Sequence, residues 1–294
     1  MTLVQVVRIN FLIQGGGEMN TQTERAITRI NPNETEARGS LFVGRGLNKR
    51  YGGLHALRDV DLTMYHGEVL ALVGDNGAGK STLIKAISGA IVPDSGSIQF
   101  GGVDVTFTRP TDATDVGIET VHQNLGLVDE LDVTQNVFLG RELTQSALRF
   151  LPRLDKQEMR RQTVELLRNF SIAMPKLNDP VRKLSGGQRQ IIAISRLLLA
   201  EPKLLIMDEP MAALGIDEGS KVLRLVAKLR ETGITTLIIS HNLEHVFGLA
   251  DRVAVMKNGS MVGVKQTEET TKEEIVSMIT IGQVPGGEAE HVSH

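Results

Sequence analysis

The chain has 294 residues and a formal net charge of −3 at pH 7. Hydrophobic residues make up 41% and charged residues 23%, which is ordinary globular composition and excludes a largely disordered or collagen-like chain. The lack of cysteine excludes disulfides, thiol catalysis and thiolate metal sites. The acidic balance and the 3% aromatic content argue against a basic nucleic-acid-binding module or a base-stacking surface.

Residues 1–40 are predicted to be a flexible N-terminal extension. The stretch 18–40 is polar and cannot bury enough apolar surface to offset the entropy lost on ordering it. Met19 is an alternative start. No stretch of the sequence approaches the roughly 20 apolar residues of a membrane span, and the N-terminus lacks the basic region of a signal peptide.

The first half of the chain predicts short strands and one helix. Strands are expected over 41–43, 60–64, 69–73 and 97–100, a turn over 93–96, and a helix over 79–88. Apolar residues spaced among charges predict an amphipathic surface helix over 155–170. This helix indicates a helical subdomain inserted between two α/β parts.

The second half returns to an α/β pattern. The continuous apolar runs 204–207 and 235–239 are typical of parallel strands that are covered on both faces. A helical stripe lies between them, formed by Val222, Leu225, Val226 and Leu229. The segments 253–256 and 261–264, joined by Asn258-Gly259, predict a hairpin. His291 and His294 fall in a polar tail that we expect to be frayed rather than to bind metal.

A glycine-rich stretch between the strand 69–73 and the following helix predicts a phosphate-binding loop. It reads Gly74, Asp75, Asn76, Gly77, Ala78, Gly79, Lys80, Ser81, which fits G-x-x-x-x-G-K-[ST], and Thr82 follows. Its backbone N–H groups can converge on phosphate oxygens at a helix N-terminus. Lys80 is expected to reach the β- and γ-phosphates, and Ser81 to offer its hydroxyl to Mg²⁺.

Two carboxylates, Asp208 and Glu209, end the apolar strand 204–207. In open α/β sheets ligands bind at that edge, so Asp208 is expected to hold Mg²⁺, usually through water. Glu209 is expected to act as general base toward the attacking water. The alternative is structural, because acidic residues often end strands near a helix N-terminus.

A third polar element precedes the helical run 191–199. In Leu184-Ser185-Gly186-Gly187-Gln188-Arg189-Gln190, Ser185 is a plausible helix cap, and the two glycines expose backbone N–H groups. The chain already holds one complete phosphate loop, so a second phosphate site makes sense if it serves a neighbouring molecule's nucleotide. The alternative is an ordinary cap.

Here the sequence resembles the ATP-binding cassette (ABC) ATPases, because the stretch 184–190 matches their signature motif. The family's other motifs are present in order, over roughly 41–264: Walker A at 74–81, Walker B at 204–209, a Q-loop glutamine at Gln123, a switch histidine at His241, and an adenine-stacking aromatic at Tyr51. The resemblance implies a P-loop NTPase core with a mixed sheet, an N-terminal antiparallel β subdomain and an inserted α-helical subdomain at about 125–200. It places a C-terminal helix and frayed tail over 265–294.

The resemblance also implies a mechanism in which two chains sandwich two Mg·ATP. One chain would supply Tyr51, the loop 74–82, Gln123, Asp208, Glu209 and His241, with Ser81, Gln123 and Asp208 nearest the metal. The facing chain would supply Ser185, Gly186, Gly187 and Gln188. Glu209, His241, Gln123 and Lys80 would carry catalysis.

Further likeness points to the carbohydrate-uptake branch of bacterial importers (the ribose, xylose and fructose types). It rests on the stretches 136–142 and 209–215, including Gly215, a position where many cassettes have aspartate; Met211 stands where Thr or Ser is commoner. Implied partners are a membrane permease, a sugar-binding protein acting indirectly and a second ATPase subunit, with no nucleic acid. The implied location is peripheral, on the cytoplasmic face of the inner membrane.

Two other functions remain open at this point. One is an ABC-type ATPase that remodels a nucleic-acid or ribosomal partner, although no long coiled-coil insertion or tandem cassette is present. The other is a P-loop kinase acting on a small molecule, which does not explain the stretch 184–190.

Overall fold

The computed structural model describes residues 39–283 except 149–150, 171, 173–175 and 213. Of residues 146–148 and 151–152, the backbone alone is described. The predicted extension up to residue 38, the alternative start Met19, and the tail with His291 and His294 lie outside this part of the chain.

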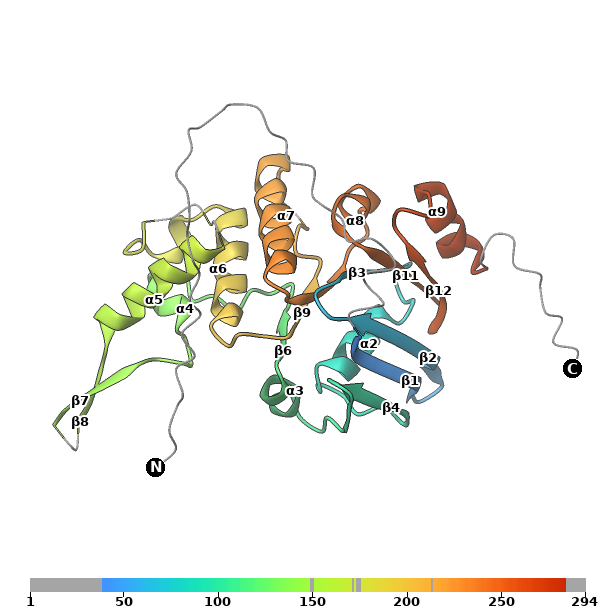
Figure 1. Ribbon diagram of the computed structural model, residues 1–294, viewed down its shortest axis with the longest axis horizontal. Helices are drawn as coiled ribbons and strands as arrows, with labels where there is room; N and C mark the ends of the chain where they lie inside the picture. Colours follow the sequence, from blue (N-terminus) through green and yellow to red (C-terminus); the bar gives the residue numbers. More distant parts are fainter. Residues whose placement is uncertain (1–38, 149–150, 171, 173–175, 213, 284–294) are drawn as a thin grey trace, which may run out of the picture.

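A six-stranded mixed sheet forms the centre of the molecule (Figure 1). Its order is β12 (Ser260–Gln266), β11 (Arg252–Lys257), β3 (Val69–Val73), β10 (Thr235–Ile239), β9 (Leu204–Asp208) and β6 (Ile118–Val121). Neighbouring strands are parallel except β12, which pairs antiparallel with β11 at one edge. The predicted P-loop-type α/β fold with a mixed sheet is therefore confirmed.

Alternate residues of each central strand enter two separate cores. In β3, Val69, Ala71 and Val73 pack on one side, whereas Leu70 and Leu72 pack on the other. Strands β9 and β10 alternate in the same way. This double burial is the physical reason why these strands are continuous apolar runs rather than alternating ones.

A smaller antiparallel sheet and two helices flank one face. The strands of this smaller sheet have the order β2 (Leu54–Tyr65), β1 (Ser40–Tyr51), β4 (Ser95–Phe100) and β5 (Val103–Val105). The core on this side also takes in helix α2 (Lys80–Ile87), the predicted helix over 79–88, and helix α3 (Pro110–Val116). Strands β1 and β2 are much longer than the predicted segments 41–43 and 60–64.

The helical part lies at one end of the molecule (Figure 1). It holds α4 (Val133–Val137), a projecting hairpin of β7 (Thr144–Leu148) and β8 (Leu151–Leu154), α5 (Lys156–Asn169), a 3₁₀ turn (Val181–Lys183) and α6 (Gly186–Leu198). Helix α5 is the predicted amphipathic helix, because Asp155 caps its first turn while Met159 and Leu167 are buried.

Three helices complete the other face: α7 (Ile216–Glu231), α8 (Leu243–Leu249) and α9 (Lys272–Ile281). The predicted stripe on α7 is buried at every position. The β11–β12 turn has positive φ at Asn258 (50°) and Gly259 (85°), as a two-residue type I′ hairpin turn requires. Within 39–283, setting aside the gaps named above, no helix combines the length and the apolar character needed to cross a bilayer.

Candidate functional site

The site lies at the edge where the parallel strands β3, β10, β9 and β6 end. Residue pairing puts Leu72 beside Ile239, Ile239 beside Asp208, and Met207 beside Val121. The phosphate-loop sequence follows β3, the two carboxylates follow β9, and His241 and Gln123 follow β10 and β6. One sheet edge thus collects groups that are widely separated in sequence.

The loop backbone is shaped by glycines that have no room for a side chain. Gly74 has a φ of 149°, and a Cβ there would lie 2.2 Å from the Met256 carbonyl oxygen. Gly79 has a φ of 105°, and its Cβ would lie 2.7 Å from the Ala56 carbonyl oxygen. The backbone is therefore pressed between β2 and β11, in conformations that L side chains rarely adopt.

The turn of the β11–β12 hairpin is hydrogen-bonded to this loop. The Gly259 N–H donates to the Ala78 carbonyl at 3.0 Å, and the Gly259 carbonyl accepts from the Arg58 N–H at 2.8 Å. Sequence reasoning missed this support, because no local pattern links the hairpin turn to a loop so distant in the chain.

Lys80 lies across the loop as the first residue of α2. Its Nζ donates to the Gly74 carbonyl at 2.6 Å and the Asp75 carbonyl at 2.9 Å. Burial lowers the pKa of Lys80, and the negative charges of Glu209, Asp75 and Asp208 oppose that lowering. The loop cation and the carboxylates of the β9 end therefore share one electrostatic environment.

Glu209 leaves its strand through a left-handed backbone. Its φ is 49°, which is rare for a residue with a side chain and costs about 1 kcal/mol. Its N–H donates to the Ile239 carbonyl at 3.0 Å, which ties this turn to β10. The carboxylate then meets His241, with Oε1 of Glu209 and Nδ1 of His241 2.9 Å apart.

The oxygen donors expected near a metal fit Mg²⁺. Asp208 is half-buried at the end of β9, while the Ser81 hydroxyl and the Gln123 amide belong to exposed residues. Magnesium in phosphate sites uses one or two carboxylates and takes its other ligands from phosphates and water. In the described residues no group of three or more His, Cys, Asp or Glu forms a metal site by itself.

The remaining loop residues differ in exposure. Asn76, Gly77 and Ser81 are exposed, Thr82 is half-buried and Ala78 is buried. Tyr51, 45% exposed, ends β1 at the Gly52-Gly53 turn of the β1–β2 hairpin, with Lys49 Nζ 5.9 Å from its ring centre. Its ring is thus available to stack on a flat ligand.

The signature segment forms the N-terminal tip of α6. The Ser185 hydroxyl accepts the Gln188 N–H at 3.4 Å, and Gln188 Oε1 accepts the Ser185 N–H at 3.0 Å, which makes a capping box. A Cβ on Gly187 would lie 2.8 Å from Cβ of Glu218, so α6 packs closely against the first turn of α7. Among the described residues, no hydrogen bond or ion pair joins this tip to the loop of its own chain.

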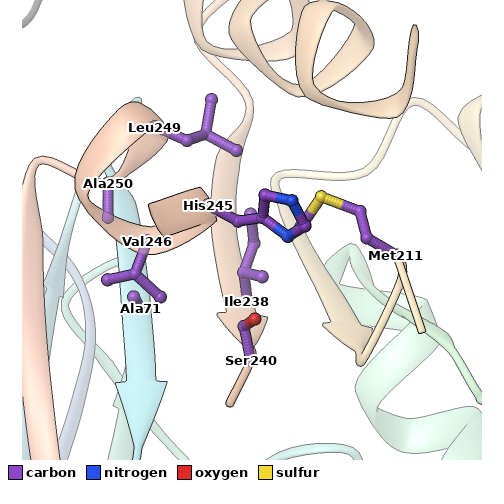
Figure 2. Close-up of a pocket in the computed structure, with 8 residues that line it drawn as sticks. All are labelled: Ala71, Met211, Ile238, Ser240, His245, Val246, Leu249 and Ala250. Carbon is purple, nitrogen blue, oxygen red and sulfur yellow. The ribbon is translucent and has the colours of Figure 1, made fainter. Parts of the chain in front are cut away.

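Met211 turns into its own chain. It is buried, and Figure 2 shows its sulfur directed toward the His245 ring in a small pocket beside Ser240. The pocket volume is about 10 Å³, which accommodates at most one water molecule. Both side chains therefore pack the space between the β9 end and α8, and the pocket is no ligand site.

The sequence of this chain is similar to those of known proteins. A match to the family described as "ABC transporter" spans residues 57–212. The fructose import ATP-binding protein of Rhizobium meliloti is 41% identical, over 86% of this chain and 98% of that protein. The xylose/arabinose import ATP-binding protein of Sulfolobus acidocaldarius is 42% identical, over 83% of this chain and 96% of that protein.

Solved structures agree with the sequence relatives. A nucleotide-free ATP-binding cassette from an ABC transporter superposes with a TM-score of 0.72 at 28% identity, covering 85% of this chain and all of that one. A dimeric cassette in a post-hydrolysis state bound to ADP and Pi gives a TM-score of 0.64 at 25% identity, covering 77% of this chain and 98% of that one.

Proposed function

Because the chain belongs to the ABC transporter family and is an ATPase cassette of that family, we propose that it drives sugar uptake through a membrane permease. The observation that carries the catalytic part is the convergence of Lys80, Asp208, Glu209 and His241 on one sheet edge. The names of the fructose and xylose/arabinose import relatives support the sugar class of the cargo.

In this proposal ATP lies along the loop 74–82, with its adenine against Tyr51. The loop N–H groups and Lys80 hold the β- and γ-phosphates, which puts positive charge where negative charge develops during phosphoryl transfer. Mg²⁺ bound by Ser81, Gln123 and Asp208 supplies further charge neutralisation.

Hydrolysis needs a water molecule aimed at the γ-phosphorus. Glu209 accepts a proton from that water, and His241, whose Nδ1 lies 2.9 Å from the carboxylate, holds Glu209 in place. Because Gln123 follows β6 on the same sheet edge, it can orient the water from the opposite side. The rate gain then comes from positioning and charge rather than from covalent chemistry.

A second copy of the chain completes the site. In the tip formed by Ser185, Gly186, Gly187 and Gln188, the first two residues are exposed at a helix N-terminus, and among the described residues the tip makes no polar contact with its own loop. We therefore place it against the γ-phosphate of the facing subunit. The dimeric relative bound to ADP and Pi supports such an assembly.

Closure of the dimer would move the helical part relative to the sheet and transmit that motion to the permease. The segment after Gln123, up to about Glu142, is the proposed contact. The protein would then act at the cytoplasmic face of the inner membrane, held there by its permease, with a sugar-binding protein delivering the cargo on the other side.

The dimer can be tested by cross-linking, because the chain has no cysteine of its own. Asn76→Cys and Ser185→Cys are introduced on separate chains, mixed, and treated with a short bis-maleimide with and without Mg·ATP. The proposal expects cross-linked heterodimers that depend on ATP. Equal cross-linking without nucleotide, or none with it, would contradict the facing arrangement.

The transport role is tested separately by purifying the tagged protein from membranes of its own host. Co-purification of a permease whose binding protein captures a monosaccharide, with ATP hydrolysis stimulated by that loaded binding protein, is the expected result. Co-purification with ribosomes or nucleic acid instead would contradict it.

A further inference from the structure

We propose that Arg196 is a positioning residue that ties the segment immediately after Gln123 to helix α6, so that flexing at the connection between β6 and the helical part is confined to residues 122–124. The inference rests on the proposed function, in which Gln123 and Ser185 contact ATP at opposite sites of a dimer. It adds a residue that touches neither nucleotide.

Arg196 is the one charged residue in the apolar run 191–200. Its guanidinium donates hydrogen bonds to the backbone of residues 125–126. Nη1 donates to the Gly126 carbonyl at 2.8 Å, and Nη2 donates to the Leu125 carbonyl at 2.9 Å. A Cβ on Gly126, whose φ is +58°, would lie 3.4 Å from Nη2. The glycine therefore serves the left-handed backbone that directs two successive carbonyls at the planar guanidinium, and a lysine cannot donate to both in the same geometry.

Two further contacts fix the same segment to the helical part. Arg189 of α6 pairs with Asp129 at 2.6 Å. Asn136 of α4 is completely buried, accepts from the Val128 N–H at 2.8 Å, and donates to the carbonyls of Val128 and Leu131. Residues 125–131 are thus held by α6 and α4 along their length.

The other side of Gln123 belongs to the sheet. Val121 ends β6 and pairs with Met207 of β9. His122, Gln123 and Asn124 are exposed and lie between these two fixed ends. On this side of the helical part, a rotation relative to the sheet is absorbed in this short stretch, because Val121 is bound to the sheet and residues 125–131 are bound to α4 and α6. The second connection, residues 199–203, joins α6 to β9.

A second guanidinium and a carboxylate lie near Arg196 where β6, α4 and α6 meet. Glu119 of β6 is buried and pairs with Arg141, which follows α4, at 2.5 Å. Burial lowers the pKa of Arg196, and the nearby charge of Arg141 lowers it further, whereas Glu119 opposes both effects. The Glu119 carboxylate therefore offsets part of the repulsion between the two guanidinium groups.

This arrangement makes a specific kinetic prediction. ATP affinity is set mainly by the loop 74–82 and Tyr51, which Arg196 does not contact. Loss of the fork would instead let Gln123 depart from its orientation, which lowers kcat and raises the Mg²⁺ concentration needed for half-maximal rate. A residue with a merely structural role would lower the melting temperature without separating kcat from KM.

The test compares Arg196→Met and Arg196→Lys with Arg182→Ala as matched control. Arg182 pairs at 3.1 Å with Glu130 in the same segment, but both side chains are more than half exposed. Arg196→Met is expected to lower kcat about tenfold with KM for ATP within about twofold of wild type. The kcat of Arg196→Lys should lie between those of Arg196→Met and wild type, and Arg182→Ala should have the kcat and KM of wild type.

Hydrogen–deuterium exchange of the full-length protein supplies a second readout that needs no activity. The backbone amides of residues 125–131 should exchange about tenfold faster in Arg196→Met than in wild type. In Arg182→Ala they should exchange at the wild-type rate. Unchanged exchange there, or a kcat loss accompanied by an equal rise in KM, would overturn the inference. Wild-type protein that fails to hydrolyse ATP would instead refute the proposed function, while the exchange result would still decide whether the tie exists. If Arg196→Met does not fold, the same two assays are applied to Arg196→Lys and to Gly126→Ala, which strains the left-handed backbone that presents the two carbonyls.

Discussion

Nδ1 of His241 lies 2.9 Å from Oε1 of Glu209, although the two residues follow different strands. The Glu209 side chain is 22% exposed, whereas that of His241 is 76% exposed. The carboxylate is therefore sheltered within the sheet edge, and the imidazole covers it from the solvent side. In the proposed reaction the two act as a unit, and neither is correctly oriented without the other.

Glu209→Gln tests the proposed general base. The variant keeps the size and backbone of the site, so ATP should bind with wild-type affinity. Hydrolysis should fall about 10³-fold, because general-base catalysis contributes factors of this order. Phosphate release measures the rate, and size-exclusion chromatography should reveal a long-lived ATP-bound dimer.

Glu268→Gln is the matched control for that variant, because Glu268 is an exposed carboxylate outside the site. It should hydrolyse ATP at the wild-type rate. Normal turnover in Glu209→Gln would remove Glu209 as the base.

Lys80→Ala tests the phosphate cradle. Removing a cation that lies 2.6 Å from the Gly74 carbonyl should weaken ATP binding about 100-fold, the effect typical of truncating one partner of a close charge pair. Equilibrium binding of a fluorescent ATP analogue measures it. Lys85→Ala, an exposed lysine in the last turn of the same helix, should bind normally. Equal affinities for the two variants would refute the assignment of Lys80.

Gly74→Ala and Gly77→Ala separate crowding from backbone strain. At Gly77 (φ 82°) no atom lies within 4 Å of an added Cβ, so only strain of about 1 kcal/mol is expected. At Gly74 the new Cβ meets the Met256 carbonyl, so the free energy of unfolding should fall by about 3 kcal/mol. Urea denaturation of both variants measures the difference, and equal losses would contradict the packing argument.

Glu68 predicts a pH dependence of stability. It is fully buried in the turn between β2 and β3, and burial raises its pKa to about 7, although the Arg252 guanidinium, 3.3 Å from its carboxylate, opposes the rise. Between its ordinary pKa of 4.5 and about 7 the folded state holds a proton that the unfolded state has lost. Its stabilising contribution is therefore complete below 4.5 and is lost as the pH rises through 7.

The comparison of wild type with Glu68→Gln isolates this effect. The unfolding free energy of wild type relative to the variant should fall by about 2.5 kcal/mol between pH 5 and pH 8. Denaturation at four pH values measures it. A difference that stays constant across this range would show that Glu68 titrates near its usual pKa.

Sequence patterns predicted the parts of the fold that depend on local periodicity. The strands β3, β9 and β10 are buried on both faces, so their apolar runs were diagnostic. The predicted ends of β1 and β2 were wrong. Both strands carry exposed charged residues and several register shifts, which interrupt the alternation of apolar and polar residues. Helix α4 is only five residues long, and the capping box of Asp132 and Gln135 was its only strong local signal.

In the candidate site, too, the sequence predicted local features but not the contacts between distant segments. The spacing of Gly74, Gly79 and Lys80 predicted a phosphate loop, and the rule for parallel strand ends predicted that Glu209 would lie near it. The support from Gly259 and the grip of Arg196 on Leu125 and Gly126 could not be predicted. Such contacts join segments far apart in sequence and follow from tertiary packing alone.

Gly187 of the signature tip packs closely against Glu218, and in the proposed dimer it also lies beside the phosphate bound by the facing subunit. In the proposed dimer one side of the glycine faces the other subunit's phosphate, and the other side abuts the helix that follows its own acidic strand end. A single enlarged side chain in one protomer would then damage both active sites at once, through ligand contact in one and helix displacement in the other. In the proposed dimer, each protomer's signature tip would therefore make the two ATP sites mutually dependent, so that one defective subunit would silence a pair.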